Sequence, residues 1–294
     1  MTDFVREKQS AALSSLLAAV GLTAFKIIVG VATGSLGILA EAAHSGLDLV
    51  AAGLTFVAVR LSGRPADREH LYGHGKIENL SALAETLLLL LTCAWIVWEA
   101  VHRLRTHHTE IQVTVWSFVV MLTSIVVDIS RSRLLSRAAR KYHSQALEAD
   151  ALHFTTDVWS SSVVIVGLAA VKAGDWWPRL LFLRNADAIA ALGVSALVVW
   201  VSVRLGRRTL DALIDKAPEG MDQRIVAAVE GVEGVRNCHN VRMRYSGPIL
   251  FIDLHVLVDG AQSLAQAHLL TETIEEVIRG FAPNADVTVH PEPF

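Results

Sequence analysis

The chain is poor in charge and in cysteine. Only 19% of its 294 residues are charged, against about a quarter in an ordinary soluble domain. Its two cysteines are Cys93, in an apolar run, and Cys238, in the polar C-terminal part, and so few do not indicate a disulfide framework. The net charge of -3 is too small to indicate nucleic-acid binding, so no nucleic-acid partner is expected.

Two further kinds of signal are missing. The N-terminal segment MTDFVREKQSAALSSLL has no short apolar stretch followed by a small-residue cleavage site, so no removable signal peptide is expected. The sequence also lacks a nucleophile–base arrangement, a phosphate loop and a nucleotide motif. We therefore expect no enzyme and no organic cofactor.

The chain is rich in long apolar runs. Hydrophobic residues make up 52% of it, and six segments are apolar enough for the ~20 helical residues that cross a bilayer. They lie near 10–32, 36–60, 78–102, 112–130, 146–171 and 185–205. We predict an α-helical membrane protein with six transmembrane helices over residues 1–208, in contact with the lipid bilayer, and a small cytoplasmic domain over 209–294.

The distribution of lysine and arginine predicts the orientation. Six spans place both termini on one side, and that side carries most of the basic residues near the spans, including those at 131–141 and 204–208. Because cytoplasmic loops are enriched in such residues, both termini are predicted to be cytoplasmic, in a multi-pass protein of the inner (cytoplasmic) membrane.

The C-terminal part reads as a soluble α+β domain. Residues 222–231 and 263–281 have helical patterns, with Ser263 as an N-cap. Residues 248–258 and 286–290 have strand patterns, and the order helix–strand–strand–helix–strand suits a small α+β sandwich. A sheet of this size needs its helices, and a partner subunit would help, to bury its face.

Ionisable residues inside the spans point to metal. His44 and Asp48 stand four apart in the second span, and His153 and Asp157 repeat that spacing in the fifth. Residues four apart share a helix face, so two facing helices would supply four ligands. Two imidazoles and two carboxylates form a set that suits Zn²⁺. The alternative is that these groups are hydrogen-bonding links between helices.

The same four residues suggest how metal movement could be coupled to protons. Two aspartates offset one divalent cation, so the loaded site is near neutral. Once the metal leaves, protonated histidines would balance the charge of the two aspartates in its place. An unperturbed imidazole titrates near 6.5, and metal binding requires its neutral form, so binding of the metal and of protons would alternate.

Two more clusters lie outside the spans. Asp67, His70 and His74 are spaced three and four apart in the loop after the second span, which suits either a second metal site or a solvated loop. The C-terminal part holds five further candidate ligands, which only the fold could bring together: His239, His255, His268, His290 and Glu292. For His268 an ordinary surface position is slightly favoured.

These motifs resemble the cation diffusion facilitator family of metal transporters, in particular its bacterial zinc and iron exporter-like members. The matching stretches run through nearly the whole chain: GSLGILAEAAHSGLDL, PADREHLYGHGKIENLSAL, SQALEADALHFTTDVWSS, NADAIAALGV and HNVRMRYSGP…IDLHVLV…QAHLL…VTVHPEP. The GHGK loop together with the two four-spaced pairs is the most specific part.

The resemblance implies a six-helix membrane part, a cytoplasmic ferredoxin-like domain, a homodimer and exchange of metal for protons. It implies a transport site at His44, Asp48, His153 and Asp157 and a loop site at Asp67, His70 and His74. A tail site is implied at His239, His255, His290 and Glu292, and His268 matches a metal-binding position of some members. Lys76 and Asp215 match a salt bridge between the two parts, and Leu152 matches an apolar gate residue.

Two positions depart from the family pattern. Some bacterial members carry aspartate where this chain has His44, and the two-histidine version is similar to that of zinc-selective members. Glu292, after Pro291, stands where close relatives have aspartate, which alters the geometry of the tail site.

The leading hypothesis is a proton-coupled exporter of divalent cations with Zn²⁺ as cargo. One alternative is an exporter of broader specificity for cadmium, cobalt, iron or manganese. The other is a membrane scaffold that senses metal through its tail without transporting it.

Overall fold

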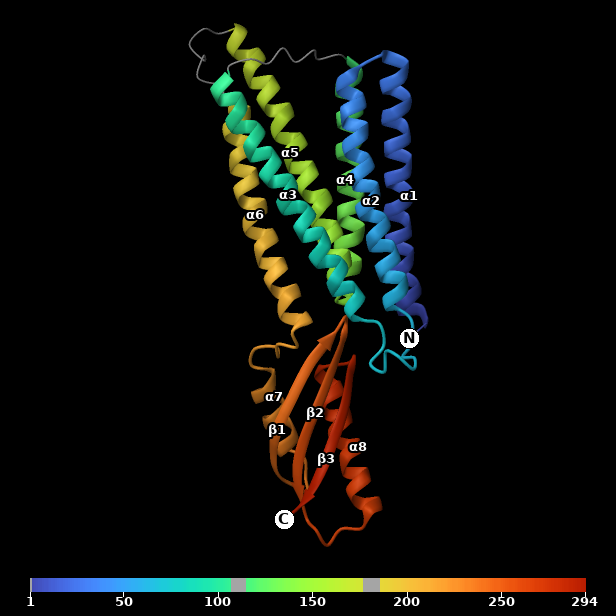
Figure 1. The fold of residues 1–294 in the computed structure, drawn as a ribbon. Helices are drawn as coiled ribbons and strands as arrows, with labels where there is room; N and C mark the ends of the chain where they lie inside the picture. Colours follow the sequence, from blue (N-terminus) through green and yellow to red (C-terminus); the bar gives the residue numbers. More distant parts are fainter. Residues whose placement is uncertain (1, 107–114, 177–185) are drawn as a thin grey trace.

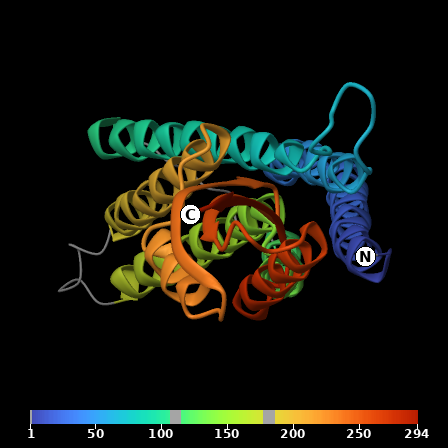
Figure 2. The same cartoon turned by 90° about the horizontal axis from the view of Figure 1, so that it is seen from below.

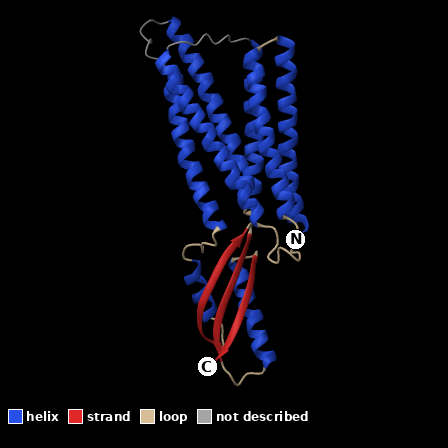
Figure 3. Ribbon diagram, viewed as in Figure 1, coloured by secondary structure: helices blue, strands red, loops and turns tan. Residues whose placement is uncertain are grey.

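The computed structural model describes residues 2–106, 115–176 and 186–294, and consists of a helical bundle above a small α+β domain (Figures 1 and 3). The bundle helices are α1 (Thr2–Thr33), α2 (Leu36–Ser62), α3 (Lys76–Thr106), α4 (Val115–Tyr142), α5 (Gln145–Trp176) and α6 (Ala186–Leu213). Each corresponds to one predicted segment, although positions 112–114 and 185 of the predicted segments lie outside the described residues. The predicted domain boundary at 208 falls inside α6.

The helices are long enough to cross a bilayer. The shortest, α2, has 27 residues and so spans ~40 Å, against ~30 Å of hydrocarbon. Within the described residues, three stretches meet both length and hydropathy criteria for a span: Val5–Thr33, Glu41–Ser62 and Lys76–Trp98. Large apolar side chains such as Leu17, Ile28 and Leu91 are more than half exposed on the outside of the bundle, where lipid would cover them.

Small side chains allow the helices to pack closely. The largest buried cluster of the bundle includes Ala12, Ala52, Ala139 and Ala146 around the larger Phe154. In a membrane, association of helices depends on such close contact because lipid is as apolar as the side chains. α1 and α6 lie on opposite sides of the bundle, and the small domain lies below it (Figures 1 and 2).

A buried ion pair ties the lower end of the bundle together. The Glu78 carboxylate, at the start of α3, accepts hydrogen bonds from the Lys8 ammonium of α1 and the Ser144 hydroxyl before α5. The Ser62 hydroxyl at the end of α2 donates a third at 2.7 Å. Glu78 is 1% exposed and Lys8 2%. One carboxylate therefore contacts three other segments of the bundle.

The small domain has the predicted order of elements. It comprises α7 (Met221–Glu230), β1 (Val235–Ser246), β2 (Ile249–Val258), α8 (Leu264–Phe281) and β3 (Ala285–Pro293). The sheet order is β1-β2-β3, with β1 and β2 antiparallel and β2 and β3 parallel. The Ser263 hydroxyl caps α8 in a capping box with Gln266. This confirms the predicted ferredoxin-like α+β domain.

One face of the sheet is covered by helices and the other is open. Along β2, Ile252, Leu254 and Val256 are buried in a core that also holds Ile274 and Ile278 of α8. The residues between them point the other way, because successive strand residues alternate between faces. His255 is therefore on the open face.

The two domains meet at the β1–β2 turn. The Asn79 side chain of α3 accepts a hydrogen bond from the Gly247 N–H at 3.2 Å. Gly75 packs so closely that a Cβ atom there would lie 2.3 Å from the Ser246 carbonyl oxygen. In the loop before α3, the Tyr72 ring lies edge-on to Phe251 of β2, with 5.2 Å between centroids.

Candidate metal sites

The structure brings together three of the four predicted transport-site residues. His153 Nε2 of α5 lies 3.1 Å from Asp48 Oδ1 of α2 and 3.7 Å from Asp157 Oδ2. One ligand atom from each of these residues lies within 4.8 Å of the others, a spacing that one metal ion could bridge. All three are at least partly buried, and His153 is 6% exposed. Carboxylates in such a place need a cationic partner.

His44 lies at the edge of this group. Its Nε2 atom is 4.0 Å from Asp48 Oδ1, and 44% of its side chain is exposed. A rotation about its side-chain bonds would be needed to complete a four-ligand set. Glu41, on the same face of α2, pairs with Lys26 of α1 at 3.3 Å. The Lys26 side chain is buried in the bundle and does not extend to the membrane surface. Its ammonium also donates a hydrogen bond to Ser45 Oγ at 2.7 Å.

Leu152 directly precedes His153. It is half-buried and packs against Ala82, Ala149 and Leu205 of α3, α5 and α6. The predicted gate residue therefore lies where three helices meet beside the transport-site histidine.

The loop residues form a compact group at the lower end of the bundle. Asp67 Oδ1 lies 3.3 Å from His70 Nδ1, and Asp67 Oδ2 lies 3.4 Å from His74 Nε2. The His70 backbone N–H donates to Asp67 Oδ1 at 2.7 Å and the Glu69 N–H at 2.9 Å. The hydrogen bond from the His70 N–H is the main cause of a lowered pKa for the Asp67 carboxyl, so this group is charged and available to a cation.

Strand register gathers the tail residues. His239 of β1 is the cross-strand partner of His255 of β2, and His255 is the register partner of His290 of β3. The three imidazoles thus form a row across the open face of the sheet. Glu292 follows two residues after His290, on the same face.

The tail carboxylate contacts all three histidines. The Glu292 carboxylate lies 2.7 Å from His255 Nδ1, 3.2 Å from His239 Nε2 and 3.8 Å from His290 Nε2. The His255 hydrogen bond lowers the pKa of Glu292, with smaller contributions from the charges of the three histidines. Glu292, which the family resemblance assigns to the tail site, therefore lies against the histidine row.

His268 is placed apart from these contacts. It lies on α8 and pairs with Glu272 of the same helix, with Nε2 3.5 Å from Oε1. Its side chain is 69% exposed. Within the described residues, the tail group that could hold one ion consists of His239, His255 and Glu292.

The predicted salt bridge is present within one chain. Lys76 Nζ at the start of α3 lies 2.8 Å from Asp215 Oδ1, after α6, and 3.3 Å from the Leu213 carbonyl oxygen. Arg244 of β1 approaches Asp215 Oδ2 at 3.8 Å, and its guanidinium lies 4.1 Å from the centroid of the Tyr72 ring.

Sequence reasoning missed several polar residues around these sites. Asn240 has a left-handed φ of 51° at a β-bulge in β1 and places its side-chain nitrogen 3.2 Å from His255 Nε2. Asparagine tolerates this conformation, which is a weak signal in a sequence. Glu85 and Asp150 are 1% exposed, and acidic residues within apolar runs were the available signal for them.

Long helices that enclose a His and Asp group, above an α+β domain with its own histidine row, define a membrane protein that handles metal ions. Comparison with known proteins gives the family. Residues 12–214 match the model of the cation efflux transmembrane domain, and residues 217–294 match that of the cation efflux protein cytoplasmic domain.

Relatives resemble the chain over nearly its full length. Cation-efflux pump FieF of Cronobacter sakazakii is 34% identical over 292 residues, which cover 99% of this chain and 94% of that protein. The FieF pump of Serratia proteamaculans is 33% identical over 294 residues, with the same coverage. A solved structure of the MamM CTD, spanning 215–293 of that protein, is 31% identical with a TM-score of 0.25, over 26% of this chain and 98% of that one.

The chain belongs to the cation efflux family, which is the cation diffusion facilitator family that its motifs resemble. It is therefore a multi-pass membrane transporter that exports divalent metal cations, with six transmembrane helices, and it is not an enzyme.

Proposed function

We propose that this transporter exports Zn²⁺ from the cytoplasm in exchange for protons, through a site made of His44, Asp48, His153 and Asp157. The observation that supports this most is the approach of His153 Nε2 to carboxylates from two helices, at 3.1 Å and 3.7 Å. Two imidazoles with two carboxylates suit Zn²⁺ better than the harder divalent cations.

The same contacts support proton exchange. A divalent ion held by Asp48 and Asp157 is balanced by their two negative charges. When the ion leaves, the carboxylates remain at least partly buried and need positive charge nearby. Protonated His153 already lies within reach of both, and His44 lies at the edge of the group, so protons can replace the ion.

We extend the proposal to the remaining parts of the molecule. Both termini are cytoplasmic in this proposal, in an inner membrane, and residues 1–208 and 209–294 act as separate domains in a homodimer. The match of residues 217–294 to the cytoplasmic domain of cation efflux proteins supports the side on which this domain lies. Leu152 gates the transport site, and Lys76 with Asp215 joins the two domains.

In this proposal two further sites bind metal without carrying it across the membrane. The loop site consists of Asp67, His70 and His74, and the tail site of His239, His255, His290 and Glu292. The exposed contact of His268 with Glu272 favours a surface role for that histidine.

A transport assay tests the proposal. Purified full-length protein in vesicles is loaded with a zinc-sensitive or a pH-sensitive dye, and Zn²⁺ is added with and without a pH gradient. We expect Zn²⁺ movement with opposite proton movement in the parent, and loss of both in His153→Ala and Asp157→Ala. Ser162→Ala, on the same helix, is the matched control. Parental Zn²⁺ transport by His153→Ala would refute the four-residue site.

The alternatives have distinct outcomes in the same vesicles. Replacing His44 by aspartate should move the preference away from Zn²⁺ towards harder ions such as Mn²⁺, and an unchanged preference would show that His44 does not set selectivity. Equal transport of cadmium, cobalt, iron and manganese by the parent would favour the broad-specificity exporter. Metal binding without accumulation in vesicles would favour the sensing scaffold.

A further inference from the structure

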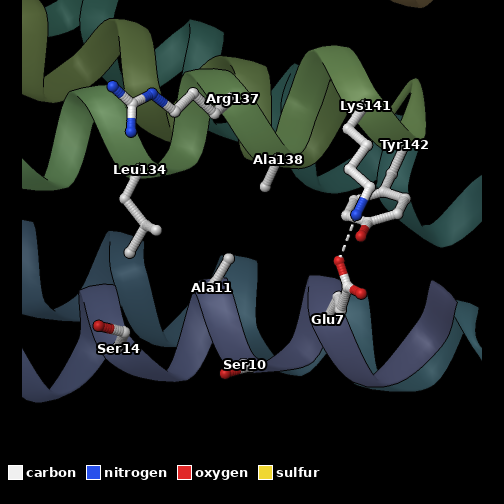
Figure 4. A pocket seen from close by; sticks show the side chains of 9 residues that line it. All are labelled: Glu7, Ser10, Ala11, Ser14, Leu134, Arg137, Ala138, Lys141 and Tyr142. Atoms are coloured by element: carbon white, nitrogen blue, oxygen red, sulfur yellow. Dashed lines mark hydrogen bonds and ion pairs between the residues drawn. The ribbon is translucent and has the colours of Figure 1, made fainter. Parts of the chain in front are cut away.

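An open groove lies between α1 and α4 at the end of the bundle nearest the small domain, and none of the candidate metal ligands lines it (Figure 4). Its volume of about 360 Å³ is in the range of small-ligand sites. The α1 wall is made by Ser10, Ala11 and Ser14, and the α4 wall includes Leu134 and Ala138. Both sets follow helical spacing, so each helix presents one face to the groove.

Small side chains explain why the groove is there. On the inner side of this helix pair, larger residues such as Leu135 fill the space between the helices, while Tyr142 lines one end of the groove (Figure 4). On the outer side, serine and alanine leave room that the protein does not fill. Because Ser10 and Ser14 are exposed, the groove opens outwards, towards lipid.

The groove carries an unbalanced positive charge. Lys141 and Glu7 pair across it at 2.6 Å (Figure 4). Arg137 also lines it, and its guanidinium extends along α4 towards Leu134, apart from that pair. In the part of the chain that the structure describes, Arg137 makes no ion pair or hydrogen bond.

The position of this charge relative to the bilayer selects its partner. The α1 wall of the groove, Ser10 to Ser14, begins five residues inside the candidate span Val5–Thr33, about 8 Å from the start of that span. The groove therefore lies near the end of the span that is closest to the small domain, where the phosphates of lipids lie. Beyond the groove, α1 exposes Leu13 and Leu17, at 42% and 62%, which would continue an apolar surface for an acyl chain.

We propose that this groove binds an anionic phospholipid of the leaflet nearest the small domain, with its phosphate on Arg137 and an acyl chain between α1 and α4. Basic pockets between membrane helices on the cytoplasmic side recognise such headgroups. Arginine is suited to phosphate because its planar fork donates two parallel hydrogen bonds.

Native mass spectrometry of the full-length protein in detergent tests this site. Phosphatidylglycerol and phosphatidylcholine with identical acyl chains are titrated separately, and binding is counted per chain. We expect Arg137→Gln to weaken phosphatidylglycerol binding about fivefold and phosphatidylcholine binding less, because the choline group of that lipid offsets the charge of its phosphate. Arg133→Gln, which removes an exposed charge of α4 outside the groove, is the matched control.

A second variant tests the groove rather than the charge. Ser14→Phe fills the space between the helices and should weaken the binding of both lipids, whereas Val20→Phe, at an exposed position of the same helix outside the groove, should not. Equal losses in Arg133→Gln and Arg137→Gln would overturn the proposal in favour of general surface attraction. Retention of lipid by Ser14→Phe would also overturn it, as would displacement of lipid by an equal concentration of inorganic phosphate. These readouts do not involve transport, so they are independent of the proposed exchange of zinc for protons.

Discussion

The buried Glu78 carboxylate offers the sharpest test of what holds the bundle together. Replacing Glu78 with alanine removes the acceptor of the Lys8 ammonium and of two serine hydroxyls. The ammonium cannot reach water without movement of α1, because only 3% of the Lys8 side chain is exposed. Glu78→Ala therefore removes the carboxylate that pairs with this buried ammonium.

The expected loss follows from burial. Breaking a buried ion pair by removing one partner costs about 3–5 kcal/mol, against a total stability of about 5–15 kcal/mol for a typical protein. The exposed pair of Glu7 and Lys141 provides a comparison, since both side chains are more than half exposed. Glu7→Ala should cost at most about 1 kcal/mol, as exposed pairs usually do.

Unfolding by denaturant in detergent, followed by helical circular dichroism, gives the free energy of unfolding for each variant. The double variant Lys8→Met with Glu78→Leu should recover most of the stability, because an apolar pair of similar volume removes both charges together. A loss below about 1 kcal/mol for Glu78→Ala, equal to that of the exposed pair, would refute the reasoning. A double variant no more stable than Glu78→Ala would refute it as well.

Further outcomes are expected at Gly75 and at Cys238. Gly75→Ala should loosen the contact between the small domain and the bundle, because the added Cβ would lie 2.3 Å from the Ser246 carbonyl oxygen. Limited proteolysis between the domains should then be faster than in the parent. Gly46→Ala, with nothing within 4 Å of its added Cβ, should be cleaved at the parental rate. Burial, followed by the Glu230 charge, raises the pKa of the Cys238 thiol from 9.0 to about 11. In a Cys93→Ala background, Cys238 should thus resist alkylation at pH 8 until the protein is denatured. The folded state retains the thiol proton that the unfolded chain releases, so this group should lower stability as pH rises between about 9 and 11. Equally fast alkylation of native and denatured protein would contradict that assignment.

The sequence was most informative where a period or a spacing had a single structural meaning. Four-residue spacing placed His153 and Asp157 on one face of α5, and the alternation of β2 placed His255 opposite the apolar core. The end of α4 was predicted poorly, because the apolar run stops near 130 while the helix continues to Tyr142. The residues beyond 130 are largely arginine, leucine and alanine, which favour helix in water as in lipid.

Contacts between distant segments could not be read from the sequence. Glu78 stands at a predicted span end, where an acidic residue usually faces water, and its partner Lys8 lies 70 residues earlier. The approach of Asp48 to His153 similarly depends on how α2 packs against α5. The sequence predicts the same role as a metal ligand for His44 and His153. In the structure His44 is more exposed than His153, because its side chain projects towards the exposed side of α2.

The histidine row of the small domain makes the tail site an indicator of strand alignment. His239, His255 and His290 come from three strands, and they share the open face only in the observed register. A slip of β3 by one residue would turn His290 and Glu292 towards α8 and bring Pro291 and Val289 to the open face. Insertion of a single residue into β3 ahead of His290 would therefore dismantle the site while leaving every ligand in the chain.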